Sequence, residues 1–169
     1  KTILMHVVKT IAIWGSIWAA PMMLVYVTLG PDHVLWDVGA FFSQLAVVTF
    51  GGAYAVLAYM AQEAVTGFAW LNAGEMADGL GLAETTPGPL IMIVTWVGYM
   101  GGVAKEVFSN SIVAGLAGAA AATFFTFLPS FFFIIAGGPL VESSRGEIKF
   151  TAPLTGITAA VVGVIINLA

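Results

Sequence analysis

The charged residues of this chain gather in a few short stretches and leave long apolar intervals between them. No Lys, Arg, Asp or Glu occurs within residues 10–31, 38–62, 85–104, 107–141 and 150–169. A helix needs about 20 apolar residues to cross the roughly 30 Å of hydrocarbon in a bilayer, and each interval reaches that length. The pattern predicts an all-α polytopic membrane protein with about five to six transmembrane or re-entrant helices.

Composition argues against several other classes of protein. Charged residues make up 8% of the chain, too few for the outer face of a soluble domain of this length. The net charge of −4 argues against nucleic-acid binding, which needs a basic patch. The chain has no cysteine, and no motif surrounds its two histidines. We therefore expect no metal, no cofactor, no nucleic-acid partner and no enzymatic activity.

The run Glu84-Thr85-Thr86-Pro87-Gly88-Pro89 interrupts the apolar pattern most sharply. Proline lacks a backbone N–H and pushes the preceding residue toward extended geometry, so a helix should begin abruptly at Pro87 or Pro89. Such a start leaves first-turn amides unpaired at the positive end of the helix dipole, which suits an anion. The donors on offer there are the amides of Gly88, Leu90 and Ile91 and the hydroxyls of Thr85 and Thr86.

Two further helix breaks are expected. Thr49 and Phe50 precede the pair Gly51-Gly52 inside the interval 38–62, which indicates either a broken helix or close helix packing. Pro129 should divide the interval 107–141 into a span and a re-entrant half-helix that ends at Gly137-Gly138-Pro139. Transporters often build sites from the amino ends of such broken helices. The alternative is that the glycines only permit packing and the prolines only turn the chain.

The remaining elements follow from local signals. We expect a first span over residues 10–30 with a kink at Pro21, and a last span over 151–169. Asn72 followed by Glu75 is typical of a capped start for a short helix through Leu80. A third span should run from Pro89 to about Gly102, and Gly98-x-x-x-Gly102 is suited to seating another helix closely.

The charges also favour a topology. All five basic residues lie outside residues 31–84, a stretch that holds six acids. If the interval 38–62 is a hairpin and Pro129 separates two crossings, all five bases share one side of the membrane. The positive-inside tendency would make that side cytoplasmic.

These motifs define a candidate site. We expect the substrate-binding residues to be Gly51, Gly52, Thr85, Thr86, Gly88 and Leu90. Glu84 and Asp78 are candidates for proton coupling, because carboxylates near hydrocarbon bind protons more readily. The alternative, favoured for Asp78, is a solvated loop charge. Phe50, Pro87, Pro89 and Pro129 should shape the site.

The segments 41–60, 70–92 and 157–169 resemble the chromate ion transporter family, as do Phe127-Leu128-Pro129-Ser130 and the Gly137-Gly138-Pro139 turn. The likeness covers about residues 28–169 and is closest to the carboxy-terminal half of two-domain members. It implies two parts. Residues 1–37 form a first transmembrane helix and connector, as a link from a preceding half, and residues 38–169 form the chromate transporter-type membrane domain.

The resemblance also implies a function. A multi-pass protein of this kind exports chromate, with sulfate as a similar oxyanion, across the bacterial inner (plasma) membrane in exchange for another ion. It implies a partner, either the homologous amino-terminal half or a second copy that forms a dimer, within the lipid bilayer. The alternatives are a non-transporting membrane assembly subunit, or an uptake carrier for sulfate or another small anion.

Overall fold

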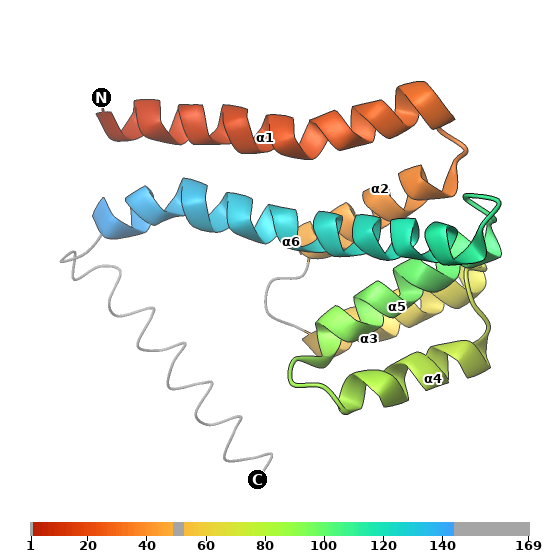
Figure 1. The fold of residues 1–169 in the computed structure, drawn as a ribbon. Helices are drawn as coiled ribbons and strands as arrows, with labels where there is room; N and C mark the ends of the chain where they lie inside the picture. Colours follow the sequence, from red (N-terminus) through yellow and green to blue (C-terminus); the bar gives the residue numbers. More distant parts are fainter. Residues whose placement is uncertain (1, 49–52, 144–169) are drawn as a thin grey trace, which may run out of the picture.

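The computed structural model describes residues 2–48 and 53–143, and the regular elements of this part are all helices (Figure 1). They are α1 (Thr2–Leu29), α2 (Val34–Val48), α3 (Ala53–Gln62), the π-helix η1 (Glu63–Gly67), α4 (Ala73–Glu84), α5 (Pro89–Ala104) and α6 (Ser111–Ser143). Two segments, Val7–Leu29 and Ser111–Pro139, are long and apolar enough to cross a membrane. The predicted all-α fold is confirmed, and the expected last span lies outside the described residues.

The two long helices α1 and α6 run antiparallel to each other (Figure 1). Trp14 stacks on Phe131 and Trp18 contacts Phe132, with 6.4 Å between the ring centroids of each pair. The outward side of α1 exposes large apolar side chains such as Leu24 and Val27. A continuous apolar surface of this kind suits contact with lipid.

Helices α5 and α6 form the most closely packed pair. A Cβ built on Gly98 would lie 2.6 Å from the carbonyl oxygen of Gly118, and one on Gly102 would meet the carbonyl of Ala114. The hydroxyls of Thr95 and Thr123 hydrogen-bond across the same seam at 3.0 Å. The prediction that Gly98-x-x-x-Gly102 seats another helix is therefore confirmed, and that helix belongs to the same chain.

Helices α2 and α3 form a first hairpin. Phe41, in the middle of α2, contacts Tyr59, near the end of α3, with ring centroids 6.0 Å apart. Leu45, one turn further along α2, lines a cavity together with Val56 of α3. This antiparallel register means that the chain reverses direction between the two helices, as in the hairpin that the topology prediction assumes for the interval 38–62.

Helices α4 and α5 form a second hairpin. Asn72 caps α4 as expected: its side chain accepts from the Glu75 amide at 3.0 Å, and the Glu75 carboxylate accepts from the Asn72 amide at 2.7 Å. On α5, the indole N–H of Trp96 donates to the Glu75 carbonyl at 3.0 Å. Gly79 lies directly beneath this indole, where a Cβ would stand 2.6 Å from Nε1. The tryptophan therefore fixes the two helices together.

Both hairpins open toward the same end of the molecule, where residues 30–33, 63–72 and 105–110 lie (Figure 1). We call this the connecting end. The π-helix η1 closes α3 there, and Trp70 packs against Gly101 of α5. Trp70 also stacks on Phe68, with centroids 4.4 Å apart and planes 11° from parallel. The hairpins are thereby anchored at their open ends.

Two predictions about α6 are wrong. Pro129 does not break it, and Gly137-Gly138-Pro139 is not a turn, because the helix continues to Ser143. A proline inside a helix removes one hydrogen bond, which neighbouring packing in membrane proteins often offsets. Pro129 is fully buried here, with Phe125 and Leu128 buried beside it. The hairpins α2–α3 and α4–α5 are the shorter elements that could serve as re-entrant segments instead.

One local boundary also differs from expectation. The helix that begins after Asn72 runs to Glu84 rather than to Leu80, because Gly79 is packed beneath Trp96 and does not end it. Pro21 lies inside α1, within the first span that the sequence predicts.

The predicted placement of all five basic residues on one side assumed a chain break at Pro129, and α6 shows no such break. Lys9 lies near the start of α1, whereas Lys105 follows α5 at the connecting end, on the opposite side of the molecule (Figure 1). Gln62, which ends α3, lies at the same end as Lys105. Helices α2, α3 and α4 have 15, 10 and 12 residues. At 1.5 Å per residue they are too short to cross about 30 Å of hydrocarbon.

Candidate functional site

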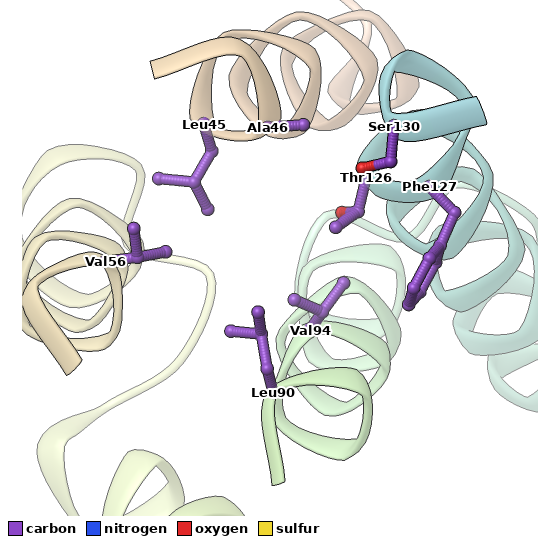
Figure 2. Close-up of a pocket in the computed structure, with 8 residues that line it drawn as sticks. All are labelled: Leu45, Ala46, Val56, Leu90, Val94, Thr126, Phe127 and Ser130. Atoms are coloured by element: carbon purple, nitrogen blue, oxygen red, sulfur yellow. The ribbon is translucent and has the colours of Figure 1, made fainter. Parts of the chain in front are cut away.

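A cavity of about 130 Å³ lies where the turn ends of both hairpins approach α6 (Figure 2). Its walls come from four helices: Leu45 and Ala46 of α2, Val56 of α3, Leu90 and Val94 of α5, and Thr126, Phe127 and Ser130 of α6. These residues flank the three motifs that the sequence singles out, around residues 50, 88 and 129. The fold therefore brings the neighbours of all three motifs to one place.

The cavity lies near the middle of the longest apolar helix. The candidate span Ser111–Pro139 has its midpoint at residue 125. Thr126 and Ser130 are within five residues of that point, and a helix rises 1.5 Å per residue, so they lie within about 8 Å of it along the axis. Sites near the bilayer midplane between discontinuous helices are common in transporters.

The chain break at the proline run is confirmed. Helix α4 ends at Glu84, Thr85 forms its C-cap, and α5 begins at Pro89. Gly88 takes a left-handed conformation with φ 82° and ψ 66°, which a residue with a side chain adopts only at a cost. This glycine lets the chain turn sharply into α5, so that Leu90 reaches the cavity wall.

The two threonines of the run contribute less than the sequence suggests. The amides of Thr85 and Thr86 donate to the carbonyls of Leu82 and Ala83, and the Thr85 hydroxyl donates to Leu82 at 2.7 Å. Neither residue lines the cavity. Both therefore close α4, whereas Leu90, whose amide the sequence also names as a donor, lines the cavity.

The other predicted residues fall into two groups. Phe50, Gly51 and Gly52 lie outside the described residues, although Ala46 and Val56 on either side of them help to line the cavity. Asp78 and Glu84 are exposed on α4 and are not part of the cavity wall. Their proposed part in proton coupling stays a prediction.

Thr126 and Ser130 are lining residues that the sequence reading missed. They are hydroxyl side chains on either side of Pro129, in an interval without charge. Polar side chains next to a proline in such an interval are a sequence signal that could have indicated these lining residues.

The cavity wall is uncharged. The sequence contains no Lys or Arg between Lys9 and Lys105 or between Lys105 and Arg145, so α2 to α6 carry no basic residue. Within the described ranges, no group of three or more His, Asp or Glu residues is placed to bind a metal ion. Any polar recognition by this chain at the cavity therefore depends on hydroxyls and backbone amides.

The comparison with known families decides what kind of protein this is. A family model described as "Chromate transporter" matches residues 36–169, which is most of the chain. The chain belongs to the chromate transporter family. The resemblance stated from the sequence is thus confirmed, and the protein is a membrane protein. No solved structure matches it.

Relatives within the chromate transporter family are longer than this chain. A chromate transport protein of Pseudomonas aeruginosa is 34% identical over 152 residues, covering 89% of this chain and 33% of the relative. One from Cupriavidus metallidurans is 31% identical over 132 residues, covering 78% of this chain and 30% of the relative. An uncharacterized transporter of Methanocaldococcus jannaschii is 28% identical over 135 residues, or 80% of this chain and 31% of the relative. The chain thus spans about a third of the length of the curated relatives it matches.

Proposed function

We propose that this chain takes part in moving chromate across the plasma membrane of a bacterium, as part of a multi-pass transporter. The observation that carries the proposal is the cavity near the middle of α6, at the amino end of α5, in a member of the chromate transporter family. The amino end of a helix carries partial positive charge and unpaired amides, so it attracts an anion without a basic side chain. An apolar wall makes that attraction stronger than it would be in water.

The cavity of one chain offers few donors for a doubly charged anion. Pro87 and Pro89 have no N–H, and no basic side chain lies on the surrounding helices. We therefore propose that a partner completes the site, either a homologous amino-terminal half or a second copy of this chain. The greater length of the relatives supports this, since they contain chain that this sequence does not match.

Export of chromate in exchange for protons, with sulfate as a competing substrate, is the transport mode that we propose. Glu84 is the carboxylate that we propose for coupling, because it ends α4 on the hairpin whose other helix lines the cavity. Asp78 lies further back on the same helix and is the second candidate.

Flux measurements in proteoliposomes test this function. Radiolabelled chromate and sulfate are followed with the purified chain alone and with its candidate partner half. Gly88→Ala should lower chromate flux, because the left-handed backbone at this position costs a residue with a Cβ about 1–2 kcal/mol. Gly81→Ala is the matched control, since a Cβ there meets no described atom within 4 Å.

Each outcome separates one function from another. Chromate flux that falls in Gly88→Ala and not in Gly81→Ala, with both proteins fully assembled, supports transport through this cavity. No flux of either anion in any combination would identify a membrane assembly subunit instead. Flux of sulfate without chromate, directed inward, would identify an uptake carrier.

A further inference from the structure

Two hydroxyl side chains of α6 face the cavity. Thr126 and Ser130 are the polar members among its eight lining residues, and they stand one helical turn apart on the same side of α6. Figure 2 shows both oxygens on the cavity side of the helix, with Leu45, Leu90 and Val94 around the same space. Hydroxyls directed into an apolar cavity can donate to a polar ligand there.

The Thr126 hydroxyl can change its partner at little cost. It donates to the Ala122 carbonyl at 2.7 Å. In an α-helix that carbonyl also accepts the backbone N–H four residues later, which is the amide of Thr126 itself. If the hydroxyl rotates toward a ligand, the carbonyl therefore keeps one donor. A hydrogen bond to an anion is roughly twice as strong as one between neutral groups, so an anion in the cavity favours the rotation.

The wall that carries the hydroxyls adjoins the wall formed by the start of α5 (Figure 2). Leu90 and Val94, in the first two turns of α5, line one wall, and Thr126 and Ser130 line the wall formed by α6. Donors on two walls suit a ligand that has several acceptor oxygens pointing in different directions. A tetrahedral oxyanion has that shape, whereas a halide is a single centre.

We propose that Thr126 and Ser130 bind the oxyanion directly through their hydroxyls and give the site its preference for tetrahedral oxyanions over halides. This inference rests on the proposed transport function and names specificity-determining residues for it. The α5 amides and the two hydroxyls contact the anion from adjacent walls of the cavity. Because no base is present on these helices, loss of the hydroxyls removes a large share of the polar contacts.

The test uses the full chain in proteoliposomes, with the partner half where flux requires it. In the double variant Thr126→Val with Ser130→Ala, the KM for chromate should rise at least about tenfold, as expected for lost hydrogen bonds to a charged group. Chloride flux should stay at the wild-type level. Thr126→Ser keeps the hydroxyl and should restore the wild-type KM.

The matched controls lie on α1. Thr28 and Ser16 donate to the carbonyls four residues earlier, at 2.7 Å each, as Thr126 does, and both are exposed away from the cavity. Thr28→Val with Ser16→Ala therefore removes the same type of local bond and should leave the KM unchanged. Should the double variant at the cavity fail to assemble, Ser130→Ala alone replaces it, because Ser130 is exposed and its loss leaves no buried gap.

The results distinguish this inference from the function on which it rests. Wild-type flux together with an unchanged KM in the cavity variants would overturn the inference and leave the transport function intact. If no version of the protein moves chromate, thermal stabilisation by added chromate becomes the measurement. If chromate raises the melting temperature of the wild type but not that of the cavity variants, the result supports hydroxyl binding. If chromate leaves the melting temperature of the wild type unchanged, both proposals are overturned.

Discussion

A Cβ added to Gly98 of α5 would stand 2.6 Å from the carbonyl oxygen of Gly118 on α6. The two helices therefore meet backbone to backbone, which glycine alone permits at this separation. The contact is paired with the Thr95–Thr123 hydroxyl bond one turn away. Together these two contacts fix the axial position of α5 relative to α6. They thereby place the amino end of α5 at the level of Thr126 and Ser130.

Gly98→Ala should destabilise the protein. The added methyl would press on Gly118 and would also stand 2.5 Å from the Cβ of Ala122, so the helices must separate. Overpacking of this kind costs about 1–3 kcal/mol. Thermal unfolding in detergent, followed by tryptophan fluorescence, measures the loss.

Gly81→Ala on α4 is the control for this substitution. A Cβ at Gly81 meets no described atom within 4 Å, and alanine favours a helix over glycine by about 1 kcal/mol. Its melting temperature should equal or exceed that of the wild type. An equal drop in both variants would show that the α5–α6 contact is not what Gly98 provides.

The sequence predicted the elements whose signals are local, and it failed where packing decides. The Asn72 cap, the break before Pro89 and the packing role of Gly98 follow from the chemistry of one or two residues. Pro129 carries as strong a local signal, yet it lies inside α6, because its burial against neighbouring helices outweighs one lost hydrogen bond. The cavity could be foreseen only in part, because Leu45, Val56 and Thr126 meet through tertiary contacts that no local pattern encodes.

The hairpin topology predicts a pattern of labelling. The chain has no cysteine, so single cysteines report access from each side of the membrane. Gln62→Cys and Lys105→Cys should react with a membrane-impermeant maleimide from the same side, because both positions lie at the connecting end. Lys9→Cys should react from the other side. Labelling of Gln62→Cys and Lys105→Cys from opposite sides would refute the re-entrant hairpins.

Asp37 should make stability depend on pH. Burial raises the pKa of this carboxyl, Asp32 raises it further, and Lys105 and His33 lower it in part. The folded state therefore favours the protonated form. Its contribution to stability is full below the unfolded pKa of about 3.9 and is lost as pH rises through the raised folded pKa.

Asp37→Asn removes this dependence. The melting temperature of the variant should exceed that of the wild type at pH 7, and the two should converge near pH 4. Lys105→Met should have the opposite effect at pH 7, since Lys105 favours the charged form of Asp37. A wild-type advantage over Asp37→Asn at pH 7 would contradict the assigned cause.

Glu84→Gln should flatten the pH dependence of chromate flux. Glu84 is exposed at the last position of α4, on the hairpin whose turn end reaches the cavity near the middle of α6. Glutamine cannot take up or release a proton, so the variant removes the proposed coupling group. Asp78→Asn, further back on α4, serves as the matched control and should keep the wild-type profile.

Flux is measured from pH 5 to 8 with equal amounts of assembled protein. A profile of Glu84→Gln that follows the wild type would exclude Glu84 as the coupling group, and a flattened profile in Asp78→Asn alone would assign that role to Asp78.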